Sequence, residues 1–286
     1  QFGRATGNRM ALRDAIGQVK DGVWQLRQPD PREYDTVQEP HARGRILVSA
    51  VFDAFLSIYK RRTADLVRLA TGGSGTLRPG AIHPDLVDRL VREATKSAQH
   101  VLTMCIRALD YCPPTDITFG EYLRAIITAD YDLVSDDDLD YRVSFVESFR
   151  RRGIFPPGVR TLSVGSLLWR SPESEAPMPS EALLQQFKQL RERGMRHVYA
   201  ESREEIFHLQ RRLRVELHNW LSQHIERVDE GRQDAAFLGL DPQKSFEVHT
   251  ARIAYRSSPD GGMSPQLLVG LLQTTTKPVD PNDPNG

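Results

Sequence analysis

The feature that most constrains this fold is a long apolar stretch from Glu39 to Ala70, EPHARGRILVSAVFDAFLSIYKRRTADLVRLA. Its apolar residues recur at helical spacing around nearly the whole helix and not along one stripe only. One face consists of Val48, Val51, Phe52, Phe55 and Tyr59, and most of the remaining surface of Ile46, Leu47, Ala50, Ala54 and Ile58. A helix that is apolar all round is typical of a central helix with other helices packed about it. The stretch therefore predicts a mainly α-helical fold.

The composition is that of a globular protein with enough apolar residues for a substantial core. The chain has 286 residues, of which 39% are hydrophobic and 27% charged. Lys+Arg and Asp+Glu number 38 each, which removes the general electrostatic argument for nucleic acid or an anionic membrane as partner. No run approaches the roughly 18 apolar residues of a membrane span, and no signal peptide is recognisable. With only Cys105 and Cys112, we predict reduced thiols and a cytoplasmic location.

Proline and helical periodicity together predict the domain organisation. We predict a helical bundle lobe over residues 1–154, a proline-rich linker over 155–179, and a smaller α+β domain over 180–286. The smaller domain is predicted to contain two helices and a β-hairpin. The expected helices span about residues 8–19, 39–70, 84–109, 118–129, 135–153, 181–194 and 202–227, and the expected strands 246–256 and 266–275.

Several polar clusters along the chain resemble calcium, nucleotide or metal sites. For each of them a purely structural interpretation is favoured. Asp136 to Asp138 have oxygen ligands suitable for calcium, but acidic residues in a first helical turn also suit the helix dipole. The glycine-rich TGGSGTLRPG follows a predicted long helix, whereas a nucleotide-binding loop follows a strand. His208, His218 and His224 lack the spacing that brings two imidazoles to one metal ion. We predict His100 to be structural.

Two separated segments resemble a known enzyme family. The stretches PHARGRILVSAVFDAFLSIY and YLRAIITADYDLVSDDDLDYRVSFVESFRRRGI resemble the C-terminal helical lobe of gluzincin zinc metallopeptidases, the thermolysin and fungalysin group. The first has the His-x-x-Gly that begins a buried helix, and the second has the closing pattern of that lobe. The resemblance covers about residues 34–154, and it extends to a bacterial family in which such a lobe is followed by an additional C-terminal domain.

The resemblance implies hydrolysis of a peptide or protein substrate by zinc-activated water. In that family two histidines of a His-Glu-x-x-His motif and a downstream glutamate bind zinc, and the glutamate of the motif is the general base. A histidine of the C-terminal lobe donates a hydrogen bond to the oxyanion of the tetrahedral intermediate. His41 matches that histidine. Glu39 or Asp35 would orient its ring, and Tyr34 is a candidate second donor.

The zinc-binding motif itself is missing from this chain. None of the eight histidines is followed by glutamate and a second histidine at the required spacing. The resemblance therefore implies that zinc and the general base belong to an upstream catalytic half of the same protein. The chain begins abruptly at Gln1, so we expect a C-terminal part that is inactive alone. The alternative is a non-catalytic interaction or scaffold module, in which the 202–227 helix and the hairpin bind a protein partner and His41 is buried with no cleft beside it. Independently of this choice, a histidine at the start of a buried helix can simply cap it or hydrogen-bond the backbone there.

Overall fold

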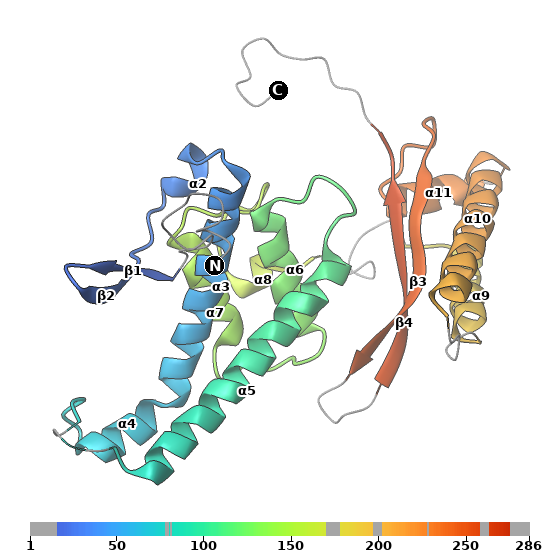
Figure 1. Ribbon diagram of the computed structural model, residues 1–286. Coiled ribbons are helices and arrows are strands. Elements are labelled where there is room, and N and C mark those ends of the chain that lie inside the picture. The colour runs from blue at the N-terminus through green and yellow to red at the C-terminus, as the bar shows by residue number, and fades with distance from the viewer. Residues whose placement is uncertain are drawn as a thin grey trace. The chain divides into compact units, whose positions relative to one another are not determined.

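The computed structural model describes residues 16–77, 80, 82–169, 178–196, 202–227, 229–257 and 263–274. The chain divides into two compact units (Figure 1), one of residues 1–112 and 117–169 and the other of residues 113–116 and 170–286. In the described parts, the first unit is helical apart from one short hairpin, and the second combines helices with a two-stranded sheet. The prediction of a mainly helical fold with a small C-terminal sheet is confirmed.

The first described element is a hairpin where the sequence predicts the end of a helix. Strands β1 (Gly17–Lys20) and β2 (Val23–Leu26) pair antiparallel. Asp21 and Gly22 form the turn with φ of 53° and 79°, values that the two central residues of a type I′ turn require. The predicted helix over residues 8–19 is therefore wrong for residues 17–19, and residues 8–15 lie outside the described part.

The central helix α3 (Pro40–Arg62) begins and ends at recognisable signals. Glu39 is its N-cap, Pro40 occupies the first turn, and the last turn carries Lys60, Arg61 and Arg62, which complement the helix dipole. The helix ends at Thr63, and a separate helix α4 (Ala64–Thr71) follows. The prediction of one continuous helix to Ala70 is therefore wrong, because the helix is interrupted at Thr63. The Thr63 hydroxyl donates a hydrogen bond to the carbonyl of Tyr59 at 2.8 Å.

Burial along α3 is narrower than its apolar sequence suggests. Only one stripe is fully buried, and it consists of Ile46, Ala50, Ala54 and Ile58. The two alanines permit a close approach of α7 (Tyr141–Arg150), where Ser148 Oγ donates to the carbonyl of Ala50 at 2.5 Å. The face predicted from Val48 to Tyr59 is half-buried, because α3 has packed neighbours on one side and not around its circumference.

Helix α5 (Pro84–Ala108) buries only part of the face that the sequence predicts. It contacts α3 and α6 (Phe119–Tyr131). The buried residues of α5 are Ser97, Val101, Met104 and Ala108. The apolar spacing predicts a buried stripe that includes Val101, Leu102 and Leu109; Val101 is buried, but Leu102 and Leu109, the latter in the 3₁₀ turn after α5, are 52% and 64% exposed. Two overlapping apolar stripes share this helix, and the contacts of the neighbouring helices determine which of them is buried.

Local capping signals place α6 and α7. Thr118 and Glu121 form the predicted capping box at the start of α6. Helix α7 begins at Tyr141, later than the predicted start after Ser135. The Asp137 carboxylate accepts the backbone N–H groups of Tyr141 and Arg142 at 2.7 and 2.9 Å. One aspartate of the acidic cluster therefore caps α7.

The first unit continues through half of the predicted linker. Residues up to Trp169 belong to it, including the short helix α8 (Val164–Leu167), whose Leu167 is fully buried. Arg124 lies over the Trp169 ring at 3.7 Å and donates to the carbonyls of Leu167 and Leu168. The predicted boundary at 154 is therefore too early, because the apolar residues after the prolines pack into the helical core. Two further short helices of this unit are α2 (Glu33–Thr36) and the 3₁₀ helix η1 (Leu109–Tyr111).

The second unit packs helices on a long hairpin. Its helices are α9 (Glu181–Met195), α10 (Arg203–Arg227) and α11 (Asp229–Phe237), and its strands are β3 (Glu247–Ser257) and β4 (Met263–Leu272). Strands β3 and β4 are antiparallel with an irregularity between Val248 and Thr250. Helices α9 and α10 contact the sheet around buried leucines such as Leu190 and Leu217. The predicted pair of helices and the hairpin are confirmed, and α11 is an addition.

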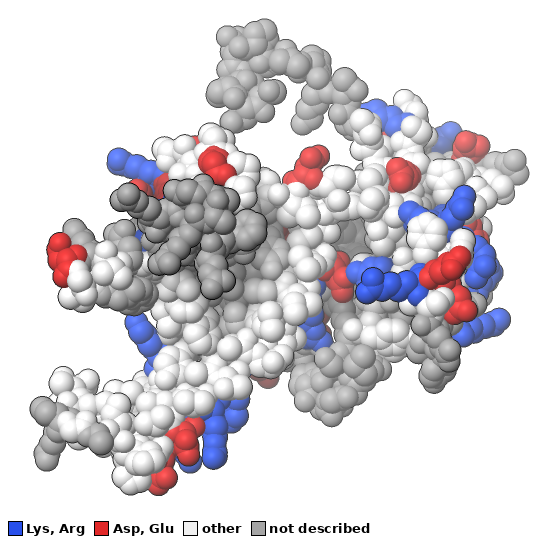
Figure 2. All heavy atoms as spheres, viewed as in Figure 1, with Lys and Arg blue, Asp and Glu red and all other residues white. Residues whose placement is uncertain are grey.

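Surface properties of the described residues agree with the balanced composition. On the face drawn in Figure 2, basic and acidic side chains are interspersed without a broad area of one sign. No helix among the described residues is both long and apolar enough to cross a membrane.

Candidate functional site

The predicted site residues His41 and Glu39 lie together at the first turn of α3. Glu39 Oε1 is 2.7 Å from His41 Nδ1 and also accepts the backbone N–H of His41 at 3.0 Å. Glu39 Oε2 accepts the backbone N–H of Ala42 at 2.6 Å. The His41 side chain is 74% exposed, so Nδ1 is occupied by the carboxylate while the rest of the ring faces solvent. Glu39 thus caps the helix and orients the imidazole at the same time.

The same contacts lower the pKa of the Glu39 carboxyl below its ordinary value of 4.5. The largest cause is the hydrogen bond from the His41 ring, followed by the backbone N–H groups of His41 and Ala42. Because the folded-state pKa is depressed, this stabilisation is present above the ordinary pKa and is lost as the pH falls through the folded-state value.

We expect a carbon NMR titration to show Glu39 ionising below 4.5. In His41→Ala the pKa should rise, since the ring hydrogen bond is gone, yet stay below 4.5 because two backbone N–H groups still favour the carboxylate. A wild-type Glu39 that titrates at or above its ordinary value would contradict this geometry.

Tyr34, the third predicted site residue, has a structural environment. Its half-buried ring packs against the core and lies 5.7 Å from the Phe119 ring. The Arg43 guanidinium lies 4.6 Å above it and donates to the carbonyls of Tyr34 and Val37. The structure gives Tyr34 no described hydrogen bond with Glu39 or His41. Asp35 is exposed, and in the described part of the chain Glu39 is the carboxylate that contacts the His41 ring.

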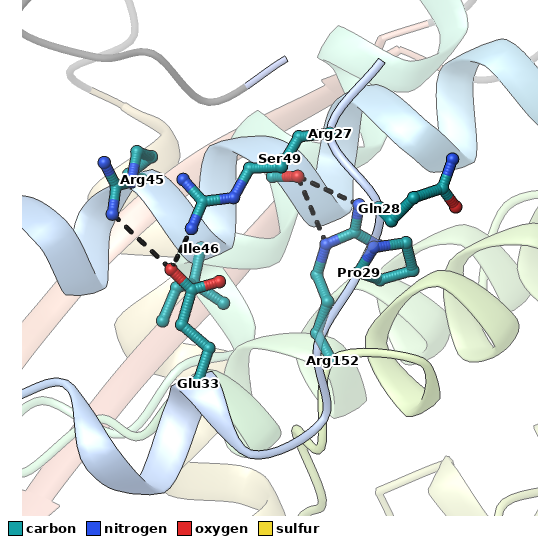
Figure 3. A pocket seen from close by; sticks show the side chains of 8 residues that line it. All are labelled: Arg27, Gln28, Pro29, Glu33, Arg45, Ile46, Ser49 and Arg152. Carbon is teal, nitrogen blue, oxygen red and sulfur yellow. Dashed lines mark hydrogen bonds and ion pairs between the residues drawn. The ribbon is translucent and has the colours of Figure 1, made fainter. Parts of the chain in front are cut away.

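One turn further along α3, a small pocket with basic lining opens beside Arg45 (Figure 3). It is lined by Arg27, Gln28, Pro29, Glu33, Arg45, Ile46, Ser49 and Arg152. On one side Glu33 Oε1 pairs with Arg27 and, at 3.4 Å, with Arg45. On the other side Arg152 donates to Ser49 Oγ through Nε and Nη2, at 3.2 and 2.9 Å. This cluster has no signal in the sequence, because its residues come from distant parts of the chain.

Arg152 is the most buried cation of this pocket, with a side chain 5% exposed. Its Nη1 lies 2.9 Å from Asp53 Oδ2 and donates to the Ser148 carbonyl at 2.9 Å. Desolvation lowers the pKa of the Arg152 guanidinium, and the hydrogen bond to Asp53 opposes that shift. Arg151 pairs with the same Asp53 oxygen. The pocket therefore adjoins a network of charges that are partly withdrawn from water.

A second polar cluster lies inside the first unit. Asp130, only 5% exposed, accepts from Arg142 Nη1 at 2.9 Å and lies 3.1 Å from His100 Nε2. The His100 ring stacks on Tyr141 with centroids 4.1 Å apart. His100 thus bridges α5 to α6 and α7, which agrees with the structural role predicted for it.

Serine, histidine and aspartate also meet in the second unit, but not as a nucleophile and base. Ser180 Oγ donates to Asp234 Oδ2 at 2.5 Å, and His224 Nε2 is 2.7 Å from the same oxygen. The serine hydrogen is therefore bound by the carboxylate and not by the imidazole. Asp234 is fully buried, and the cluster ties the start of α9 to α10 and α11.

Within the described ranges, no three His, Cys, Asp or Glu residues are grouped so that they could hold a metal ion. Asp137 is used as a helix cap, which explains the acidic cluster considered for calcium. The zinc implied by the resemblance is assigned to residues upstream of this chain.

Comparisons with other proteins do not add a relative. No family model, curated protein or solved structure matches the chain. The likeness to gluzincins therefore rests on the two sequence segments alone.

Proposed function

We propose that this chain is the C-terminal part of a gluzincin-type zinc metallopeptidase, followed by an accessory domain. In this proposal the first unit forms one wall of the substrate cleft, and His41 stabilises the oxyanion that develops during hydrolysis of a peptide bond. Zinc and the general base are supplied by the upstream half of the same protein. The observation that supports it most is the Glu39–His41 contact of 2.7 Å on a ring that is 74% exposed.

The chemistry assigned to His41 requires a hydrogen-bond donor, because negative charge develops on the oxyanion. Glu39 contacts the ring at Nδ1, so in this proposal Nε2 is the nitrogen that donates to the oxyanion. Removing one such donor typically lowers kcat by about 10²–10³-fold.

The first test asks whether an upstream half exists. The intact mass of the natural protein is measured together with its zinc content. A mass well above 32.4 kDa with about one zinc per chain supports the proposal. A mass equal to this chain without zinc overturns it and favours the alternative, an interaction module.

His41→Ala in the full-length protein is the second test. We expect kcat for peptide hydrolysis to fall about 10²–10³-fold, with the zinc content and KM nearly unchanged. His83→Ala is the matched control, because His83 is also an exposed histidine beside a proline at a helix start. Equal turnover in the two variants would contradict the role assigned to His41.

The alternative function has its own supporting observation. In the second unit, large apolar side chains are exposed on the two longer helices, among them Leu184 at 54%, Phe207 at 55% and Val215 at 52%. Exposed apolar surface is typical of protein-binding sites when it forms a contiguous patch. A full-length protein without zinc would make this surface the first place to look for a partner.

A further inference from the structure

The pocket beside Arg45 has an excess of positive charge. Its lining contains the guanidinium groups of Arg27, Arg45 and Arg152 but only the carboxylate of Glu33. Asp53 and Arg151 adjoin it and add one charge of each sign. Four guanidinium groups against two carboxylates leave two positive charges.

Water solvates these charged groups only in part, because several of their side chains are largely buried. The side chains of Arg152, Glu33 and Arg45 are 5%, 17% and 28% exposed. Charges withdrawn from water need a partner of opposite sign or a large desolvation free energy. Each carboxylate here is shared by two guanidinium groups, Glu33 by Arg27 and Arg45 and Asp53 by Arg151 and Arg152.

Hydrogen-bond donors in the lining are also in excess. Arg45 Nε is inaccessible to solvent and has no hydrogen-bond partner. Ser49 Oγ accepts two hydrogen bonds from Arg152, and among the described residues it makes none as a donor. Arg45 and Ser49 lie four residues apart on α3, so both face the same side of the helix. Figure 3 shows the two groups on the border of the pocket.

The size of the cavity limits what can satisfy these donors. Its volume is about 10 Å³, the space needed by one water-sized occupant. The side-chain acceptors in the lining belong to Gln28, Glu33 and Ser49, whereas Arg45 Nε is a donor without an acceptor. A monatomic anion only accepts, and it also offsets the positive charge.

We propose that this pocket is a binding site for a small monovalent anion, chloride, held by Arg45 Nε, Ser49 Oγ and the Arg152 guanidinium. The ion links α3 to the turn that follows α7. Because the folded unit binds chloride and the unfolded chain does not, chloride raises the melting temperature of the first unit by mass action. This inference does not depend on the proposed peptidase function.

The test is a thermal unfolding series on the full chain at constant ionic strength, with sodium gluconate replaced stepwise by sodium chloride. We expect a saturable rise of about 3 °C in melting temperature as chloride replaces gluconate. Ser49→Ala and Arg45→Lys should remove most of this chloride-dependent rise, because each removes one of the open donors. Arg43→Lys is the control, since Arg43 contacts Tyr34 and Val37 and is not part of the pocket lining; it should retain the full rise.

Direct localisation uses bromide as the probe. Crystals grown or soaked in bromide should show an anomalous peak bordered by Arg45, Ser49 and Arg152 in the wild type and a weaker one in Ser49→Ala. Identical melting in gluconate and chloride, equal rises in all variants, or no bromide in the pocket would each overturn the proposal. Stronger stabilisation by phosphate than by chloride would overturn the assignment to a monatomic ion.

Discussion

Replacing Gly153 with alanine is expected to lower the free energy of unfolding of the first unit by about 2–4 kcal/mol. Gly153 follows the end of α7 with φ of 69°, a left-handed conformation that costs a non-glycine residue about 1–2 kcal/mol. A Cβ there would lie 2.0 Å from the carbonyl oxygen of Pro31 and 3.0 Å from its carbonyl carbon. Both atoms belong to backbone, so the clash is relieved only by moving the segment that precedes α2 away from α7.

Gly158→Ala separates the two causes. Gly158 has nearly the same φ, 71°, but no atom within 4 Å of an added Cβ. It should therefore show only the conformational cost of about 1–2 kcal/mol. The measurement is the unfolding free energy from denaturant titration followed by a probe in the first unit. Equal destabilisation by the two substitutions would mean that the contact with Pro31 is not tight.

The second large effect is expected at the buried ion pair of Asp130 and Arg142. Their side chains are 5% and 3% exposed, and Asp130→Ala removes the carboxylate at 2.9 Å, so that the Arg142 charge in the protein interior keeps only the longer contact of 3.7 Å with Asp137. Breaking a buried pair in this way costs about 3–5 kcal/mol. His100 loses the same carboxylate, so the contact between α5 and α6 is weakened as well.

Two comparisons make this expectation specific. Asp130→Leu combined with Arg142→Met removes both charges, and it should destabilise less than Asp130→Ala because no unpaired charge remains. Glu147→Ala breaks the pair with Arg150, whose side chains are 48% and 54% exposed, and should cost at most about 1 kcal/mol. If the double variant were the least stable of the three, the interior of this unit would depend on the charges themselves.

Elements whose signals lie within one turn are predictable from the sequence. The capping box of Thr118 and Glu121 is local, as are the proline at the start of α3 and the glycine after α7. The hairpin at Asp21 and Gly22 carried a local signal too, because an Asp-Gly pair favours a type I′ turn. The apolar periodicity before it led instead to a predicted helix, so this error came from weighting the wrong signal.

Which face of a helix is buried is not predictable in the same way. Two overlapping apolar faces have the same periodicity, so the sequence pattern does not distinguish between them. Helix α5 has one face with Val101 and Met104 and another with Leu102 and Ile106, and only the first is buried. In α3 the small residues Ala50 and Ala54 are buried, while the larger aromatic residues on its other side are only half-buried. The contacts with neighbouring helices determine which face is buried, and these contacts depend on side chains that are distant in the sequence.

In the candidate site too, some features follow from the local sequence and others only from tertiary packing. The sequence by itself determined that His41 begins a long helix beside an acidic residue, since Glu39, Pro40 and His41 are consecutive and their contacts lie within one helical turn. Only the tertiary structure decided that Glu39 and not Asp35 holds the ring, and that Tyr34 packs elsewhere. It alone brought Arg27, Arg45 and Arg152 around one cavity. Residues separated by more than 100 positions meet only when α3 and α7 pack, and that packing is a property of the whole core.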